Sequence, residues 1–358
     1  MHSRRAGLTL VELLVVVAIL GLLAISVLPS ISSTAEARRT REAARLVSSF
    51  IAKAQARAIG RREWSGFMLV TTNSTSSNAV ADLFLADVPA VYRGDTLPAL
   101  LAITGSTATS RTATGAVGQL TSAAAGVVQA GDLVRFNGSG PYYEIDSGSA
   151  AVTGTSIRFQ LRSYTAGAAD DAGYTTANTP WPPSGSLSFE VLRQPVAAGS
   201  PVTLPDARVI DLYWSGIGPP SLTVGSVTLS GSTYRPFLLT KSGTEATPGA
   251  SASVLFDGTG RLRQVVSRSG TSSATFRQTV TGAVFLLLGR ADRAGQAFVA
   301  NKSAADDSLG ANWQYPDSIW IAIDPMTGAV RTAECVTSST SVTDSQAWVR
   351  QALLATGR

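Results

Sequence analysis

The sequence predicts an α+β protein in which a long N-terminal helix, first transmembrane and then amphipathic, packs on an antiparallel β-sheet head. Three observations lead to this fold class. An almost purely apolar run occupies residues 8–28, apolar side chains recur at helical spacing through residues 29–62, and short strand-like runs separated by turn residues fill residues 63–358. Because no strand-like run is followed by a convincing long helix, we expect antiparallel pairing.

The first element is the apolar run. Glu12 is its only ionisable residue, and as a helix the run is about 31 Å long, which spans a bilayer core. Arg4 and Arg5 precede it, so we expect a single pass with the N-terminus in the cytoplasm and the head outside.

Glu12 is unusual in such a segment, because an intramembrane carboxylate costs about 2.5–3.5 kcal/mol on insertion scales and is usually paired or functional. A secretory signal cleaved near Ala35 or Ala37 is the alternative interpretation. That alternative does not explain Glu12, and its apolar core would be unusually long.

Residues 7–12, GLTLVE, resemble the type IV prepilin motif: a glycine, an apolar residue and a glutamate five places after the glycine, at the head of an apolar helix. The resemblance implies that a membrane peptidase cuts after Gly7 and that Leu8 becomes a methylated N-terminus. Leu8 stands where phenylalanine is most common. Glu12 would then neutralise the terminal ammonium of a neighbouring subunit, inside an apolar bundle where an unpaired charge is costly.

The second element is an amphipathic helix over residues 29–62. Pro29 removes one helical hydrogen bond and is expected to kink or loosen the helix. Beyond it one face is apolar, with Ala43, Leu46, Val47, Phe50, Ile51, Ala54 and Ala58. The other face is rich in arginine. Clustered basic residues are typical of nucleic-acid binding, but no aromatic residues interleave with them, and a solvated helix face is the simpler interpretation.

The head is expected to be a β-rich globular unit with loop insertions. The strand-like runs are residues 66–71, 133–136, 157–161, 187–192, 209–214, 237–240, 254–256, 262–266, 284–288, 319–323 and 329–333. Asp257-Gly258-Thr259-Gly260 and residues 324–328 predict two hairpin turns. Ser-, Thr-, Gly-, Ala- or Pro-rich stretches predict loops at 72–78, 104–131, 166–186 and 241–251. A short helix is expected at 345–355.

Four blocks of the chain follow the order seen in the GspH/FimT group of minor pseudopilins, which they resemble. These are residues 43–68, 204–216, 254–265 and 319–331, and the third contains the F-x-x-x-G hairpin, here Phe256 to Gly260. The long insertions between the blocks make this head larger than that of a usual member.

Composition leaves little room for catalysis. The only histidine is His2, within the predicted leader at residues 1–7, and the only cysteine is Cys335. A mature chain without histidine excludes Ser-His-Asp and Cys-His catalysis and the common zinc sites. The acid pairs Asp170–Asp171 and Asp306–Asp307 lack the ligand spacing of a known calcium loop. We therefore expect no enzyme activity, no metal site and no cofactor.

The predicted function is that of a structural subunit, a minor pseudopilin or pilin-like protein of a type II secretion pseudopilus or a type IV pilus. The expected partners are prepilin peptidase, other pilin-like subunits through the N-terminal helix, and lipid of the bacterial inner membrane. From that membrane the processed chain would enter a periplasmic pseudopilus or a cell-surface pilus. The alternatives are a DNA-binding minor pilin used in DNA uptake and a membrane-anchored hydrolase or surface binding protein.

Overall fold

A computed structural model describes residues 10–71, 78–106, 110–146, 151–160, 181–217, 223–224, 227–228, 235–237, 250–268, 275–280, 282–296, 299 and 310–335. The predicted loop at 241–251, except its last two residues, and the predicted helix at 345–355 lie outside these ranges. The predicted loop at 166–186 is described only from residue 181.

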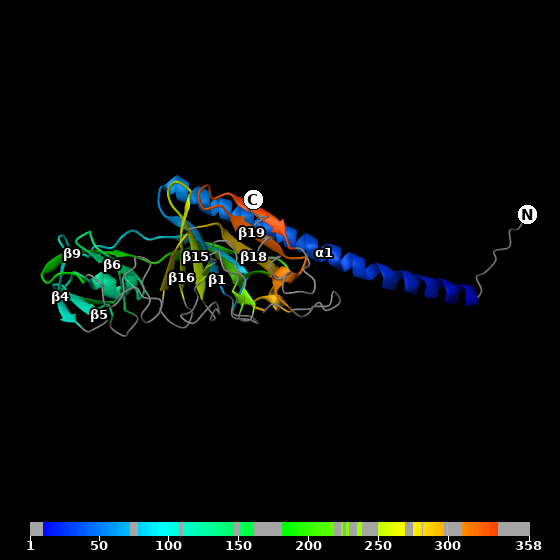
Figure 1. The fold of residues 1–358 in the computed structure, drawn as a ribbon, viewed down its shortest axis with the longest axis horizontal. Coiled ribbons are helices and arrows are strands. Elements are labelled where there is room, and N and C mark those ends of the chain that lie inside the picture. The colour runs from blue at the N-terminus through cyan, green and yellow to red at the C-terminus, as the bar shows by residue number, and fades with distance from the viewer. Residues whose placement is uncertain are drawn as a thin grey trace, which may run out of the picture.

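The fold is a single long helix laid on antiparallel sheets, which confirms the predicted α+β class. Helix α1 (Leu10–Arg61) is 52 residues long and runs through Pro29 without a break in its helical backbone. Its first half projects from the head and its second half lies along it (Figure 1). The backbone is helical on both sides of Pro29, and the kink or loosening expected there stays a prediction.

The second half of α1 buries one face in the main core. Ala43, Val47, Ile51, Ala54 and Ala58 are fully buried, as their three- and four-residue spacing predicts. Three of these five are alanines, which favour helix and let the strands approach the helix axis closely. They pack with the inner faces of two sheets in one continuous cluster.

Sheet A has the strand order β10-β3-β1-β15-β16-β17, and every pairing is antiparallel. Its strands are β1 (Ser65–Val70), β3 (Asp82–Asp87), β10 (Val196–Thr203), β15 (Ser251–Phe256), β16 (Leu262–Arg268) and β17 (Thr275–Thr279). Phe67 faces Val254 in the β1–β15 register, and both side chains point to the core under α1.

Sheet B has the order β14-β11-β18-β19-β20, with β2 paired to β11. The strands are β2 (Ala79–Val80), β11 (Arg208–Ile217), β14 (Arg235–Pro236), β18 (Val284–Arg290), β19 (Ile319–Ile323) and β20 (Val330–Glu334). The 3₁₀ turns η2 (Ala291–Arg293) and η3 (Asn312–Gln314) pack beside it, and β12 (Thr223–Val224) pairs with β13 (Val227–Thr228). Every other predicted strand run overlaps a strand, and of the run 237–240 only residue 237 lies within the described residues.

The chain between β3 and β10 folds into a closed barrel with the order β4-β5-β8-β7-β6-β9. Its strands are β4 (Leu100–Ser106), β5 (Ser110–Thr114), β6 (Leu133–Phe136), β7 (Tyr143–Ile145), β8 (Ser156–Gln160) and β9 (Ser186–Leu192), with the π-helical turn η1 (Ala123–Val127). Phe136, Tyr143 and Phe159 form its centre, with ring centroids 5.0 Å and 5.2 Å from Phe159. The barrel lies at the end of the molecule away from the N-terminus of α1 (Figure 1).

The predicted loop at 104–131 is therefore wrong in part, because it contains β5 and η1. Strand β5 has the sequence SRTAT, and only Ala113 among its five residues is fully buried. Such a strand lacks the alternation of large apolar and polar residues by which a half-buried strand is predicted from sequence.

Both predicted hairpin turns are present and converge on one side chain of α1. The Oδ1 atom of Asp257 accepts the backbone N–H of Thr259 at 2.8 Å, and Oδ1 of Asp324 accepts that of Thr327 at 2.8 Å. The Nε2 atom of Gln55 donates to the carbonyl oxygens of Gly260 at 2.9 Å and Thr327 at 2.7 Å. Each turn therefore presents a carbonyl to the helix, and Gln55 joins the two hairpins to it.

Gly328→Ala tests the contribution of the two hydrogen bonds that Gln55 donates to the hairpin turns. Gly328 has φ of +67°, and an added Cβ would lie 2.1 Å from Nε2 of Gln55, whereas Gly199 has φ of +75° and open space around it. Both alanines incur the left-handed penalty of about 1–2 kcal/mol. We expect Gly328→Ala to cost about 1–2 kcal/mol more because it displaces Gln55. Urea unfolding of the detergent-solubilised chain measures this, and equal losses for Gly328→Ala and Gly199→Ala would contradict it.

Asp257→Asn tests the first turn through its pH dependence. Burial alone would raise the pKa of Asp257, but hydrogen bonds from Thr259, Arg263 and the backbone outweigh it and lower the pKa to about 2. The ordinary pKa of an aspartate is near 3.8. The lowering of the Asp257 pKa from that value contributes about 2 kcal/mol to the free energy of unfolding. The contribution is present above pH 4 and is lost as the pH falls through about 2. The substitution should lower the free energy of unfolding at pH 7 and hardly change it at pH 2, as measured by urea unfolding at the two pH values. An equal loss at both would argue against a stabilising charge on Asp257.

Candidate functional site

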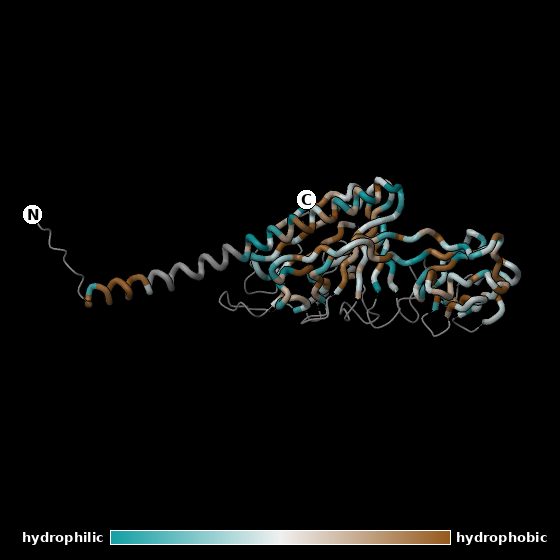
Figure 2. Tube along the Cα trace, turned by 180° about the vertical axis from the view of Figure 1, so that it is seen from behind, coloured by the Kyte–Doolittle hydropathy of each residue, from teal (hydrophilic) through white to brown (hydrophobic). Residues whose placement is uncertain are grey.

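The most unusual surface of the molecule is the projecting first half of α1. Nine large apolar side chains between Leu10 and Leu20 are exposed, from 48% for Val15 to 79% for Leu10. They follow one another closely enough to cover every side of the helix, and in Figure 2 this stretch of the Cα trace is coloured hydrophobic and lies beyond the head. We call this stretch the apolar rod. A rod of this kind requires lipid or other helices around it.

Glu12 lies in the first turn of α1, in the midst of these apolar side chains. A carboxylate near a helix N-terminus interacts favourably with the helix dipole. On an otherwise apolar surface it also favours a partner that brings a positive charge to the same level, because an unpaired charge in apolar surroundings is costly.

The structure describes only part of the predicted processing site. Gly7 and Leu8 lie outside the described residues, and Pro29 is described as helical backbone within α1. Among the residues described, no helical stretch is both long enough and apolar enough to cross a membrane.

Ion pairs fasten α1 to the head where the helix leaves it. Arg208 at the start of β11 is almost fully buried and donates to the carboxylate of Glu36, while Arg39 lies 3.3 Å from the carboxylate of Asp206. At the other end of the packed half, Nε of Arg57 donates to Asp87 at 2.9 Å, and this bond is the main reason that the pKa of Asp87 is lowered. Fixed at both ends, the packed half sets the direction in which the apolar half projects.

Metal binding and cysteine chemistry have little support in the described part of the chain. No cluster of three or more histidine, cysteine or acidic residues suitable for a metal is present there, and the pairs Asp170–Asp171 and Asp306–Asp307 lie outside it. Burial raises the pKa of the Cys335 thiol, so its reactive thiolate form is disfavoured.

The tryptophans in the described part of the head occupy separate places and do not form one binding platform. Trp313 and Trp320 are fully buried beside sheet B, and Trp214 packs edge-on against Trp313 at 5.9 Å. Trp181 belongs to the barrel instead, where it stacks on Tyr143 at 5.6 Å. Trp313 and Trp320 therefore fill the core at sheet B.

Sequence reasoning missed a buried carboxylate, Asp211 in β11. Burial raises its pKa to about 7, although hydrogen bonds from Asn312 at 3.0 Å and from the backbone N–H groups of Gly295 and Tyr213, each at 3.1 Å, oppose the shift. These donors come from η3, from the end of η2 and from β11 itself. Asp211 thus ties η3 and the residues after η2 to β11, next to the irregularity in the β11–β18 pairing, a role that only the three-dimensional arrangement reveals.

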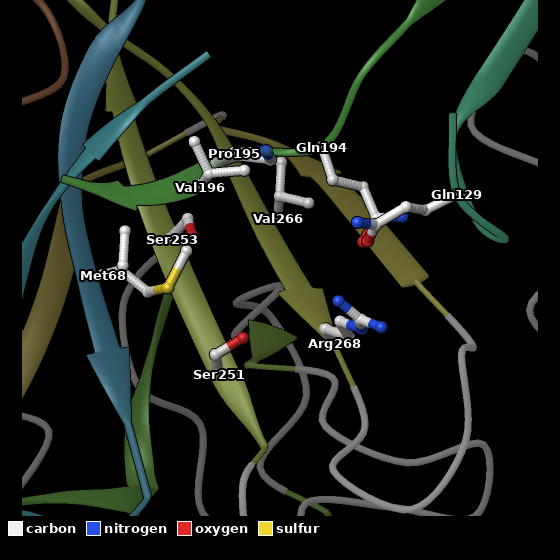
Figure 3. A pocket seen from close by; sticks show the side chains of 10 residues that line it. Met68, Gln129, Gln194, Pro195, Val196, Ser251, Ser253, Val266 and Arg268 are labelled. Atoms are coloured by element: carbon white, nitrogen blue, oxygen red, sulfur yellow. The ribbon is translucent and has the colours of Figure 1, made fainter. Parts of the chain in front are cut away.

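A groove of about 260 Å³ lies between the barrel and the outer face of sheet A (Figure 3). Met68 and Val266 form its apolar part, and Gln129 and Gln194 close the barrel side. Gln194 is already engaged, since its Nε2 donates to the Ala130 carbonyl at 2.7 Å and its Oε1 accepts from Thr275 at 3.0 Å. The groove has no carboxylate in its lining, and its polar groups connect the barrel to β17.

One protein family, described as the prokaryotic N-terminal methylation motif, matches residues 2–28. No curated protein and no solved structure matches the chain. The matched motif indicates a prepilin-type, pilin-like protein that is processed by prepilin peptidase and is associated with a membrane. Proteins with this motif are generally non-enzymatic and structural.

Proposed function

We propose that this chain is a structural subunit, a minor pseudopilin or pilin-like protein, that is processed between Gly7 and Leu8 and assembled through the first half of α1. The observation that carries the proposal is the methylation motif at residues 2–28 on a helix whose apolar side chains project beyond the head. The large apolar side chains of residues 10–20 are exposed, and such a rod is suited to packing among other helices.

The finer assignments are part of the same proposal. Residues 1–7 are a leader, residues 8–28 a transmembrane and assembly helix, residues 29–62 its amphipathic continuation and residues 63–358 the head. The chain first spans the bacterial inner membrane with its head outside the cytoplasm and then joins a type II secretion pseudopilus or a type IV pilus. The order of the four head blocks supports the GspH/FimT group of minor pseudopilins, and the absence of histidine after residue 2 supports a non-enzymatic role.

The mass of the mature N-terminus tests processing. In a host with active prepilin peptidase, we expect a chain that begins at Leu8 and is heavier by one methyl group. Intact-mass spectrometry of the purified protein gives the answer directly, and a Gly7→Val variant, which removes the residue before the cut, should keep its leader. Cleavage near Ala35 or Ala37, or no cleavage in the unsubstituted chain, would overturn the proposal.

Replacing Glu12 tests assembly. Glu12→Ala and Glu12→Gln should both be processed, and both should enter sheared fibres more than about tenfold less than the unsubstituted chain. The reason is that a charge left unpaired in an apolar bundle costs several kcal/mol, and about 1.4 kcal/mol is a factor of ten.

Val11→Ala is the matched control, because it shortens an adjacent exposed apolar side chain without altering charge. Immunoblots of the fibre fraction and of the membrane fraction measure the distribution of the subunit. Normal incorporation of Glu12→Gln would show that the charge has no part in assembly.

A further inference from the structure

The packed half of α1 carries a strong excess of positive charge. Between Glu36 and Arg61 there are seven basic residues, Arg38, Arg39, Arg41, Arg45, Lys53, Arg57 and Arg61, and two acidic ones, Glu36 and Glu42. Acidic side chains of the head, together with Glu36 of α1 itself, pair with the basic residues on the flanks of the helix. Arg39 pairs with Glu36 and Asp206, Arg41 with Glu334, and Arg57 and Arg61 with Asp87.

Three basic residues are left on the exposed surface of α1, and one of them, Arg45, also lines a hollow of about 460 Å³ against Ile319 and Thr332 of sheet B. Arg38, Arg45 and Lys53 are exposed, and none of them forms an ion pair with any residue in the described ranges. Their spacing of seven and eight residues places them on one side of the helix over about 22 Å. We call Arg38, Arg45 and Lys53 the cationic ridge.

The ridge is accessible to a second helix. Ser49, Ala52 and Ala56 lie on the same side and are exposed, so small side chains separate the cations and permit close approach of a neighbouring backbone. Glu42 is the one acidic residue of α1 on this side. The opposite side of α1 is buried under the sheets, so the ridge is the face of the packed half that remains for a neighbour.

We propose that the cationic ridge receives an acidic helix face of a different pilin-like subunit, and that the chain assembles beside that subunit in preference to a second copy of itself. The inference rests on the proposed function. Because α1 is one continuous helix, neighbours that pack along its apolar half continue past the head at helix-packing distance, about 8–10 Å between axes. A second copy would bring another cationic ridge to that place, and like charges at short range repel.

A nucleic acid fits the ridge less well. Its phosphates would complement the cations, but none of the exposed ridge positions is aromatic and none can stack a base. The continuity of the ridge with the apolar rod instead favours a partner that runs parallel to the helix.

Charge reversal in the full, processed chain tests the inference. The variant R38E/R45E/K53E serves as the acidic partner of the unsubstituted chain. The two chains carry donor and acceptor fluorophores at their C-termini in phosphatidylcholine vesicles, which have no net charge to mask the ridge. We expect the mixed pair to associate about tenfold more strongly than either chain with itself, and the difference to disappear near 1 M salt, where the Debye length is about 3 Å.

A neutral variant, R38Q/R45Q/K53Q, separates charge from packing. Its self-association should exceed that of the unsubstituted chain, because repulsion is removed and the helix surface is retained. Thermal unfolding of all three chains should agree, since the three side chains are exposed.

The outcomes distinguish the inference from the proposed function. Equal energy transfer in all mixtures would overturn the inference and leave assembly through the apolar helix intact. No energy transfer in any mixture would overturn both. Equal transfer together with salt-sensitive binding of duplex DNA by the unsubstituted chain, lost in R38E/R45E/K53E, would assign the ridge to nucleic acid instead.

Discussion

The structure depends on the burial of one face of α1 between two antiparallel sheets. Ala43, Val47, Ile51 and Ala54 bring the strands close to the helix, and Gln55 fastens the two hairpin turns to it. This packing holds half of a 52-residue helix rigidly. Helical hydrogen bonding transmits that rigidity along the chain, so the exposed apolar half projects in a defined direction rather than as a loose tail.

Much of this architecture follows from local sequence signals. The helical spacing of apolar residues predicts the buried face, and the two D-x-x-G and D-x-x-x-G turns are found where aspartate and glycine supply the required hydrogen bonds and dihedrals. Three barrel strands, β6, β8 and β9, coincide with predicted strand runs, but the barrel as a unit escapes prediction, in part because β5 is short and rich in serine and threonine. Its closure depends on contacts between β4 and β9, which are far apart in sequence, and no local pattern reports such contacts.

The residues of the candidate site and the cationic ridge also differ in how far the sequence alone reveals them. Glu12 stands out in the sequence because it interrupts an apolar run, so its position alone marks it. The cationic ridge does not stand out, because sequence shows a uniformly arginine-rich helix. Only the positions of Asp87, Asp206 and Glu334 on the head reveal which cations are neutralised. In the sequence, Asp211 is likewise only one residue of a predicted strand. The structure shows that Gly295, just after η2, and Asn312 of η3 donate hydrogen bonds to its carboxylate.

The apolar half of α1 can be surrounded by lipid or by other helices, and Glu12 makes the free energies of these two surroundings unequal. Lipid and a bundle of helices both cover the nine exposed apolar side chains, each of which gains about 1.5–3 kcal/mol on leaving water. Lipid offers no counter-charge, so the carboxylate there costs about 2.5–3.5 kcal/mol. A bundle that brings an ammonium group to the same level removes most of that cost. In the proposed assembly the apolar side chains therefore retain the helix in either setting, while the single charge favours transfer from lipid to the bundle and the register that pairs Glu12 with that ammonium.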